Sequence, residues 1–174
     1  RFRLEAQKAA GLEHPGIVPV HDMGFGADGE AYFAMRVVRG RSLAEVLRAA
    51  DPDQRSALAR SLQRAAEAVA YAHHRGVVHR DLKPANIMIG DFGEVHVMDW
   101  GLARRGGHPE PDAPAGAVSG ERGADLTQHG DVLGTPAYMP PEQAMGARDE
   151  HGPPSDVYAL GAILYHLLAG RAPY

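Results

Sequence analysis

The most informative segment of the sequence is His79-Arg80-Asp81-Leu82-Lys83-Pro84-Ala85-Asn86, in which several chemically reactive residue types lie close together. An acid is followed by a cation two residues later and by an amide five residues later. Such a set supplies a carboxylate to orient a hydroxyl, a cation for a phosphate and an amide oxygen for a metal ion. The octapeptide therefore predicts a phosphate-transfer site rather than an ordinary charged surface loop.

A β-hairpin is predicted directly after this octapeptide. Ile87–Ile89 and Val95–Met98 flank the turn residues Gly90-Asp91-Phe92-Gly93, a pattern typical of a tight hairpin. A hairpin brings its two ends together, so we expect Asp99, at the far end, to return beside Asn86. The two oxygen ligands are then placed to share a Mg²⁺ ion.

Composition excludes several other classes of protein. Of the 174 residues, 44% are hydrophobic and 23% are charged, which argues against a disordered chain. A net charge of -4 argues against nucleic-acid binding through a basic face. The absence of Cys excludes disulfides and thiolate metal sites and fits a cytoplasmic protein. The longest apolar run, Val157–Gly170, is too short to span a bilayer, and a membrane anchor downstream of this sequence stays open.

Apolar periodicity predicts alternating helices and strands around the octapeptide. The helix that follows Asp51-Pro52 carries apolar residues at spacings of four and three, so one stripe should be buried. Arg105–Asp125 is rich in Gly and Pro and is interpreted as a flexible loop. The other expected elements are a helix over Arg1–Leu12, strands over Ile17–Met23 and Ala31–Val38, a short helix from Ser42 through Ala49, and a helix after Pro153 with two apolar faces (Leu160, Ile163, Leu164, Leu167 and Leu168 on one, Val157 and Ala162 on the other).

These motifs resemble those of the protein kinases, and specifically those of the bacterial, eukaryotic-like Ser/Thr kinases. His79–Asn86 matches the catalytic loop of that family in full, and its Lys83 points to Ser/Thr substrates. Asp99-Trp100-Gly101 stands where the family has Asp-Phe-Gly. Gly134–Glu142 matches the end of the activation segment, with Pro141 replacing the usual Ala, and Asp156–Gly161 matches the start of the central helix. The tripeptide Asp91-Phe92-Gly93 has the family's spelling but lies too close to Asn86, and it is interpreted as the hairpin tip.

The resemblance implies ATP and Mg²⁺ as cofactors and assigns roles at the reacting end of the site. Asp81 would orient the substrate hydroxyl, Lys83 would hold the transferred phosphate, and Thr135 would shape the surface that docks the peptide. Asn86 and Asp99 would bind Mg²⁺.

The remaining roles concern adenine, regulation and support. Met35 falls at the gatekeeper position, and the hinge Arg36–Val38 would offer backbone groups to adenine, with Met88 beneath the ring. Glu5 matches the helix Glu that pairs with a strand lysine, and that lysine is not in this sequence. Two residues have regulatory roles: Arg80 would pair with phosphorylated Thr127. Asp156 would brace the catalytic loop, and Glu142 is a supporting residue whose usual Arg partner is absent.

The implied fold is α+β and protein-kinase-like. Residues 1–38 would form a partial small lobe and hinge that lacks its first three strands, and residues 39–174 would form a partial large lobe that lacks its last helices. Such a fragment should be inactive by itself. The implied partner is a protein with a Ser or Thr acceptor, with self-phosphorylation at Thr127.

Two other functions remain open at this point. A pseudokinase that serves as a binding scaffold would keep the fold without transfer, and a small-molecule phosphotransferase of similar fold would share the Asp and Asn spacing. The second generally lacks a segment like Gly134–Glu142. His73-His74 and His79 lack a supporting ligand pattern, so zinc is not expected.

Overall fold

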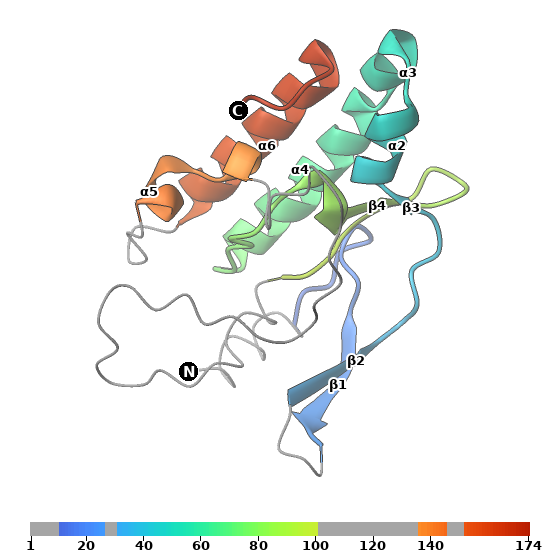
Figure 1. The fold of residues 1–174 in the computed structure, drawn as a ribbon. Coiled ribbons are helices and arrows are strands. Elements are labelled where there is room, and N and C mark those ends of the chain that lie inside the picture. Colours follow the sequence, from blue (N-terminus) through green and yellow to red (C-terminus); the bar gives the residue numbers. More distant parts are fainter. Residues whose placement is uncertain (1–10, 27–30, 101–135, 146–151) are drawn as a thin grey trace.

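The structure is a computed structural model and describes residues 11–26, 31–100, 136–145 and 152–174. The helix expected over Arg1–Leu12 falls outside these residues except for its last two positions, and the loop expected at Arg105–Asp125 falls outside them entirely. Figure 1 shows two long helices lying side by side, with one small sheet beside the helices and a second that projects away from them. The observed mixture of helix and sheet agrees with the α+β expectation.

The two long helices, α4 (Ala59–His74) and α6 (Pro153–Ala169), build most of the core. Along α4 the buried residues recur every three or four positions, as a helix with one apolar stripe requires. On α6 the side chains of Ile163 and Leu167 are almost fully buried against this stripe. The buried stripe of α4 consists of Leu62, Ala65, Ala68, Val69 and Ala72.

Two short helices, α2 (Leu43–Ala49) and α3 (Pro52–Ala57), precede α4, and both begin with a capping box. In α2, Ser42 accepts a hydrogen bond from the Glu45 backbone, and the Glu45 side chain accepts one from the Ser42 backbone. Asp51 and Gln54 do the same for α3. These reciprocal bonds satisfy amides that lack partners at a helix start, so both predicted starts are confirmed.

The single helix expected after Asp51 is in fact divided at Leu58. The Leu58 amide donates to the carbonyl of Arg55 as well as to that of Gln54, so the last turn of α3 tightens and the chain then restarts as α4. The prediction of one continuous helix was therefore wrong at this residue.

The described residues form two small antiparallel sheets. One pairs β1 (Val20–Phe25) with β2 (Ala31–Met35), and the other has the order β3-β4-β5, formed by β3 (Arg41–Ser42), β4 (Ile87–Ile89) and β5 (Val95–Val97). In the hairpin β4–β5, Ile87 faces Val97 and Ile89 faces Val95. The predicted hairpin is confirmed, because these apolar partners turn the same face toward the core.

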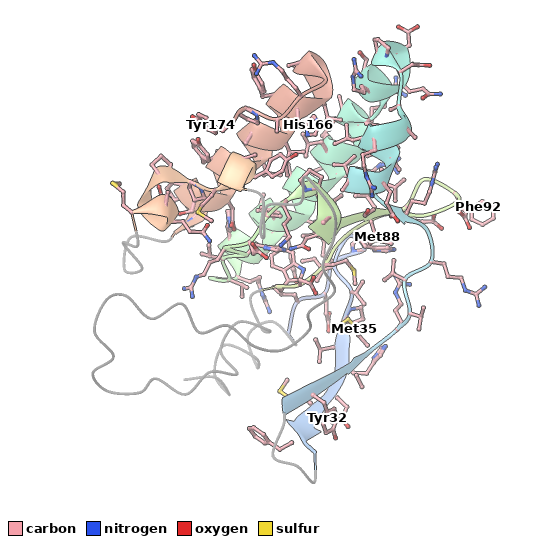
Figure 2. All side chains as sticks on the ribbon, viewed as in Figure 1. Tyr32, Met35, Met88, Phe92, His166 and Tyr174 are labelled. Atoms are coloured by element: carbon pink, nitrogen blue, oxygen red, sulfur yellow. The ribbon has the colours of Figure 1, made fainter. Side chains whose placement is uncertain are left out.

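The turn between β4 and β5 contains the tripeptide Asp91-Phe92-Gly93. Gly93 has a φ of 80°, a left-handed conformation that glycine adopts without strain, and the Phe92 side chain is 93% exposed. Figure 2 shows Phe92 projecting from the tip of the hairpin, away from the helices. The interpretation of this tripeptide as a turn is confirmed.

The strand expected over Ile17–Met23 begins later than predicted. Ile17 and Val18 are buried residues ahead of β1, and Ile17 forms a single parallel bridge to Val97. The Val97 amide donates to the Gly16 carbonyl (2.8 Å), which ties this segment to the edge of the β4–β5 hairpin. Ile17 and Val18 are thus buried in the core, and the hydrogen-bonded pairing of β1 with β2 starts only at Val20.

Both apolar faces expected on α6 are only partly buried among the described residues. Val157 is 60% exposed, and Leu164 and Leu168 are 40% and 66% exposed, whereas Ala162 is buried. The helix has apolar residues on more sides than the described part of the chain covers. Within the described residues, no helix is long and apolar enough to cross a membrane.

Candidate active site

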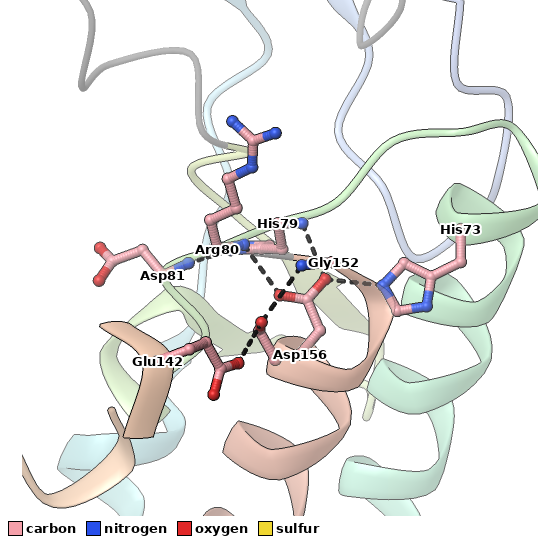
Figure 3. Close-up of polar contacts among 8 residues, drawn as sticks. His73, His79, Arg80, Asp81, Glu142, Gly152 and Asp156 are labelled. Atoms are coloured by element: carbon pink, nitrogen blue, oxygen red, sulfur yellow. Dashed lines mark hydrogen bonds and ion pairs between the residues drawn. The ribbon is translucent and has the colours of Figure 1, made fainter. Parts of the chain in front are cut away.

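The loop that follows α4 is anchored by Asp156, near the start of α6. This carboxylate is 1% exposed, and its two oxygens accept three hydrogen bonds (Figure 3). One oxygen accepts from the His79 amide (2.8 Å) and from His73 Nε2 (2.7 Å), and the other accepts from the Arg80 amide (2.8 Å). Hydrogen bonds to an ionised acceptor are among the stronger ones, so Asp156 fixes the backbone directly before Asp81.

His79 links the anchored loop to the end of the β4–β5 hairpin. The imidazole is fully buried; its Nε2 donates to the Met98 carbonyl (2.7 Å), and its Nδ1 accepts from the Asp81 amide (3.3 Å). Burial lowers the pKa of His79 below its ordinary value of 6.5, and the neighbouring acids Asp156, Asp81 and Asp99 oppose this only in part. His79 is therefore neutral, carries its ring proton on Nε2, and serves a structural role between the loop and the hairpin.

The catalytic-loop acid, cation and amide are in direct contact. Lys83 Nζ donates to Asp81 Oδ2 at 3.0 Å, and Asn86 Nδ2 donates to the Asp81 carbonyl at 2.8 Å. Both members of the Asp81–Lys83 pair remain about one-third exposed (30% and 34%), so they are open to a substrate. Asn86 is 5% exposed and lies in η1 (Pro84–Asn86), and its Oδ1 makes no hydrogen bond to the residues that the structure describes.

Asp99 and Arg80 have left-handed backbones, which non-glycine residues seldom adopt. Their φ angles are 57° and 70°, and no other described residue except glycine has a positive φ. Strain of this kind persists only where the surroundings impose it, and it concentrates at functional sites. Here the hydrogen bond of the Met98 amide to the Asn86 carbonyl (2.8 Å) closes the hairpin immediately before Asp99. As predicted, the hairpin thus returns the chain to Asn86 just before Asp99.

A small cavity of about 50 Å³ opens beside Asp81, and Arg80, Asp81 and Lys83 form one wall of it. The opposite wall comes from the segment 138–143, which joins η3 (Pro136–Tyr138) to α5 (Pro141–Ala144). This places the segment that was matched to the end of the activation segment against the acid and the cation.

Two residues make contacts that the sequence did not predict. Glu142 accepts a hydrogen bond from Ser155 Oγ (2.5 Å), which joins α5 to the start of α6 (Figure 3). His73 was dismissed as a metal ligand, and sequence reasoning gave it no other role. In the structure it pairs with Asp156, and its position on the last turn of α4 was the only signal that could have pointed to it.

The residues assigned to adenine lie on two different strands. Met35 ends β2 and is 40% exposed, whereas Met88 lies in the middle of β4 and is half-buried (Figure 2). Arg36 and Val38 follow β2 in a segment without regular structure, and Arg36 Nη2 is hydrogen-bonded to His96 Nε2 of β5 (3.0 Å). The Arg36–His96 contact joins the start of the expected hinge to the β4–β5 hairpin.

Three predicted site residues, Glu5, Thr127 and Thr135, lie outside the described residues. Their assigned roles remain predictions.

Fold and site together define a helix-and-sheet scaffold that carries a loop suited to phosphate transfer. The chain belongs to the protein kinase family: the family model described as "Protein kinase domain" matches residues 1–174. The resemblance stated from the motifs is therefore confirmed.

Curated relatives and a solved structure agree with this membership. The serine/threonine-protein kinase PknD of Protochlamydia amoebophila is 39% identical over 188 residues, which cover all of this chain and 19% of that protein. PknB of Mycobacterium tuberculosis is 39% identical over 177 residues (all of this chain, 26% of that protein), and pkn3 of Myxococcus xanthus is 39% identical over 180 residues (all of this chain, 30% of that protein). The crystal structure of the Mycobacterium tuberculosis PknI kinase domain superposes with a TM-score of 0.69 at 28% identity, covering 100% of this chain and 58% of that one.

The chain spans only 19% to 30% of the length of these three curated relatives. All of them are named serine/threonine-protein kinases, and none of the comparisons points to a scaffold without activity. The predicted α+β, kinase-like fold is confirmed by the structural match.

Proposed function

We propose that these residues are part of the catalytic domain of a protein Ser/Thr kinase, which transfers the γ-phosphate of ATP to a Ser or Thr hydroxyl. The observation that carries the proposal is the contact set of Asp81, Lys83 and Asn86, held in place by Asp156 through the amides of His79 and Arg80. Relatives named as Ser/Thr kinases and the Lys in the catalytic loop support this acceptor class.

In the proposed reaction, Asp81 orients the acceptor hydroxyl and takes its proton as the hydroxyl oxygen attacks the γ-phosphorus. The new P–O bond forms as the bond to the β-phosphate oxygen breaks, and ADP leaves. Lys83 lies 3.0 Å from Asp81, so its ammonium group is placed to hold the negative charge of the transferred phosphate. Most of the rate enhancement in this chemistry comes from positioning and charge. The Asp156 anchor contributes the positioning, because it holds the backbone directly before Asp81.

The described residues fit a Mg²⁺ ion that is shared with the phosphates. Asn86 turns its amide nitrogen toward Asp81, which leaves Oδ1 available, and Asp99 adds an exposed carboxylate on a left-handed backbone. The described part of the chain has no group of three or more His, Asp and Glu residues placed to hold a metal, which suits an ion that takes its remaining ligands from phosphate and water. When bound, Mg²⁺ neutralises charge on the phosphates.

Several finer assignments belong to the same proposal. Residues 1–38 would form a partial small lobe and hinge, and residues 39–174 a partial large lobe. Met35, Arg36, Val38 and Met88 would line the adenine site, and Thr135 would shape the surface that docks the peptide. Arg80 extends away from the Asp156 cluster in Figure 3, and we assign it to pair with phosphate on self-phosphorylated Thr127. Because ATP is the phosphate donor, the site is assigned to the cytoplasm.

The test is phosphate transfer from radiolabelled ATP, in the presence of Mg²⁺, by the full-length protein to a mixture of Ser- and Thr-containing peptides. Asp81→Asn should reduce kcat by about a hundredfold or more, because the acceptor proton loses its base. Asp53→Asn is the matched control, since Asp53 is an exposed acid on α3, far along the chain from the loop. Transfer that survives Asp81→Asn unchanged would refute the assignment.

A further inference from the structure

A second cavity, of about 180 Å³, is lined by Lys83 but not by the reacting acid Asp81. Its walls are Ala44 and Arg48 of α2, residues 83–85 of the catalytic loop, Tyr138 of η3 and His166 of α6. Lys83 and Tyr138 line both this cavity and the smaller one beside Asp81, so the two cavities adjoin. We call the larger one the α2–α6 cavity. A peptide whose hydroxyl reaches Asp81 would pass this cavity with a neighbouring side chain.

The lining of the α2–α6 cavity carries positive charge and hydrogen-bond donors. Arg48 and Lys83 are cations, and no acidic residue is among the described residues that line it. The acid nearest to Arg48 along α2 is Glu45, and its Oε2 is already engaged by the amide and the hydroxyl of Ser42 at the helix start (2.7 Å each). Arg48 binds the Ala44 carbonyl only weakly (3.4 Å), so its guanidinium group retains free donors.

His166 adds a further donor to the same wall. The Tyr138 hydroxyl lies 2.5 Å from His166 Nδ1 and has no other acceptor among the described residues, so the phenol donates to Nδ1. Burial raises the pKa of Tyr138 above its ordinary value, and the phenol keeps its proton. Burial, and then the charge of Arg55, lower the pKa of His166, which keeps the imidazole neutral near pH 7. With Nδ1 accepting, the ring proton is on Nε2, and Nε2 makes no hydrogen bond to any residue of the described segments.

We propose that the α2–α6 cavity receives a carboxylate side chain of the protein substrate and that Arg48 and His166 are the residues that select it. The proposal rests on the proposed kinase activity and narrows its substrate class to proteins with an Asp or Glu near the acceptor hydroxyl. Arg48 supplies charge and His166 a directed donor. Lys83 is committed to Asp81 and the transferred phosphate, and Ala44, Pro84 and Ala85 form an apolar lining that shields the carboxylate stem.

The test uses the full-length protein and a set of peptides that contain one Ser each. A Glu, or the isosteric but uncharged Gln, is placed singly at each of five positions on either side of the Ser, and kcat/KM is measured for every peptide. At one position, or at two adjacent ones, the Glu peptide should have a kcat/KM about three- to tenfold above that of its Gln counterpart. A ratio of this size is what the stabilisation from a partly exposed ion pair and one further hydrogen bond would produce.

Charge reversal at Arg48 makes the prediction specific. Arg48→Glu should abolish or invert the preference for Glu, measured as the ratio of kcat/KM for each Glu peptide to that for its Gln counterpart, so that any effect common to both peptides cancels. Arg60→Glu is the matched control, because Arg60 is an exposed arginine on α4 that does not line the cavity, and it should retain the preference. His166→Leu should reduce the preference about two- to threefold. Equal kcat/KM for Glu and Gln peptides at every position, or a preference that survives Arg48→Glu, would overturn the proposal.

A binding measurement separates this proposal from the kinase activity itself. Fluorescence anisotropy is recorded for labelled peptides in which Ala replaces the acceptor Ser, with Glu or Gln at the flanking positions. If no peptide is phosphorylated, the proposed function fails, but tighter binding of a Glu peptide that is lost in Arg48→Glu still supports the cavity assignment. If phosphate transfer depends on Asp81 while Glu and Gln peptides bind and react alike, the kinase assignment stands and the cavity assignment is refuted.

Discussion

Replacing Asp156 by Asn is the most informative single change, because it alters one atom in a buried anchor. Both oxygens of the Asp156 carboxylate face a backbone amide, that of His79 on one side and that of Arg80 on the other. An Asn side chain has only one oxygen, so neither of its two orientations avoids placing its NH₂ group against a backbone N–H. The substitution removes a hydrogen bond to one backbone amide, leaves that donor without a partner, and takes the charge assistance from the bonds that remain.

The cost of this change can be worked out from the contacts. Losing a hydrogen bond to a charged group and burying an unpaired donor costs about 2 to 4 kcal/mol. One tenfold change in rate corresponds to about 1.36 kcal/mol. If this free energy is lost from the conformation of the loop that catalyses transfer, kcat should drop by roughly 30- to 900-fold. KM for the peptide should change little.

Two measurements check the Asp156 prediction. The first is kcat for phosphate transfer by the Asp156→Asn protein, with Asp53→Asn as the exposed control. The second is amide hydrogen exchange at His79 and Arg80, one of which should exchange faster in the variant because it has lost its acceptor. The reasoning is refuted if kcat stays within about threefold of the unmodified protein while both amides keep their protection.

Three further predictions test other parts of the structure. Gly40 has a φ of 131°, and a Cβ there would lie 2.2 Å from the Ile89 carbonyl oxygen, so Gly40→Ala should lower the free energy of unfolding by about 2 kcal/mol or more. Gly76→Ala, at a φ of 73° with no atom within 4 Å of the new Cβ, should cost only about 1 kcal/mol, and equal losses in chemical denaturation would contradict this. Burial depresses the folded-state pKa of His79 below 6.5, so the unfolded chain binds that proton first and stability should fall as the pH decreases through 6.5 toward the folded-state pKa. Denaturation at several pH values checks the slope, which should be shallower in His79→Gln. Asp99→Asn should raise the Mg²⁺ concentration needed for phosphate transfer about tenfold or more, whereas Asp91→Asn at the exposed hairpin tip should leave it unchanged; the reverse result would exchange the roles of the two acids.

Local chemistry explains which parts of the fold could be predicted from the sequence. The starts of α2 and α3 follow from Ser42 and Asp51, because a capping box is made by residues three apart and depends on little else. The β4–β5 hairpin follows from its glycine-rich turn between apolar runs, and Gly93 does adopt the left-handed conformation that such a turn needs. Because Asp91 lies in this exposed turn, we assign the metal ion to Asp99 and not to Asp91.

Other features depend on contacts between distant residues. The break at Leu58 separates α3 from α4 within what reads as one apolar stripe, and Ile17 is buried against Val97 instead of joining the ladder of β1. The role of His73 as a partner of Asp156 spans 83 positions along the chain, and no periodicity or spacing signals it. The exposure of Val157 and Leu168 likewise depends on which neighbours cover α6.

The sequence by itself therefore determined the chemical inventory: an acid, a cation and an amide in the octapeptide, and a second acid at the end of a hairpin. Only the tertiary structure decided how that inventory is held. Asp156, from a helix far along the chain, positions Asp81 because it accepts hydrogen bonds from the two backbone amides before it. Burial keeps His79 neutral, and its side chain links the loop to the hairpin. The tertiary structure also joined Arg48, Tyr138 and His166 around one cavity. The physical reason is that hydrogen bonding within a turn is set by adjacent residues, whereas desolvation and charge pairing are set by whatever the folded chain brings into contact.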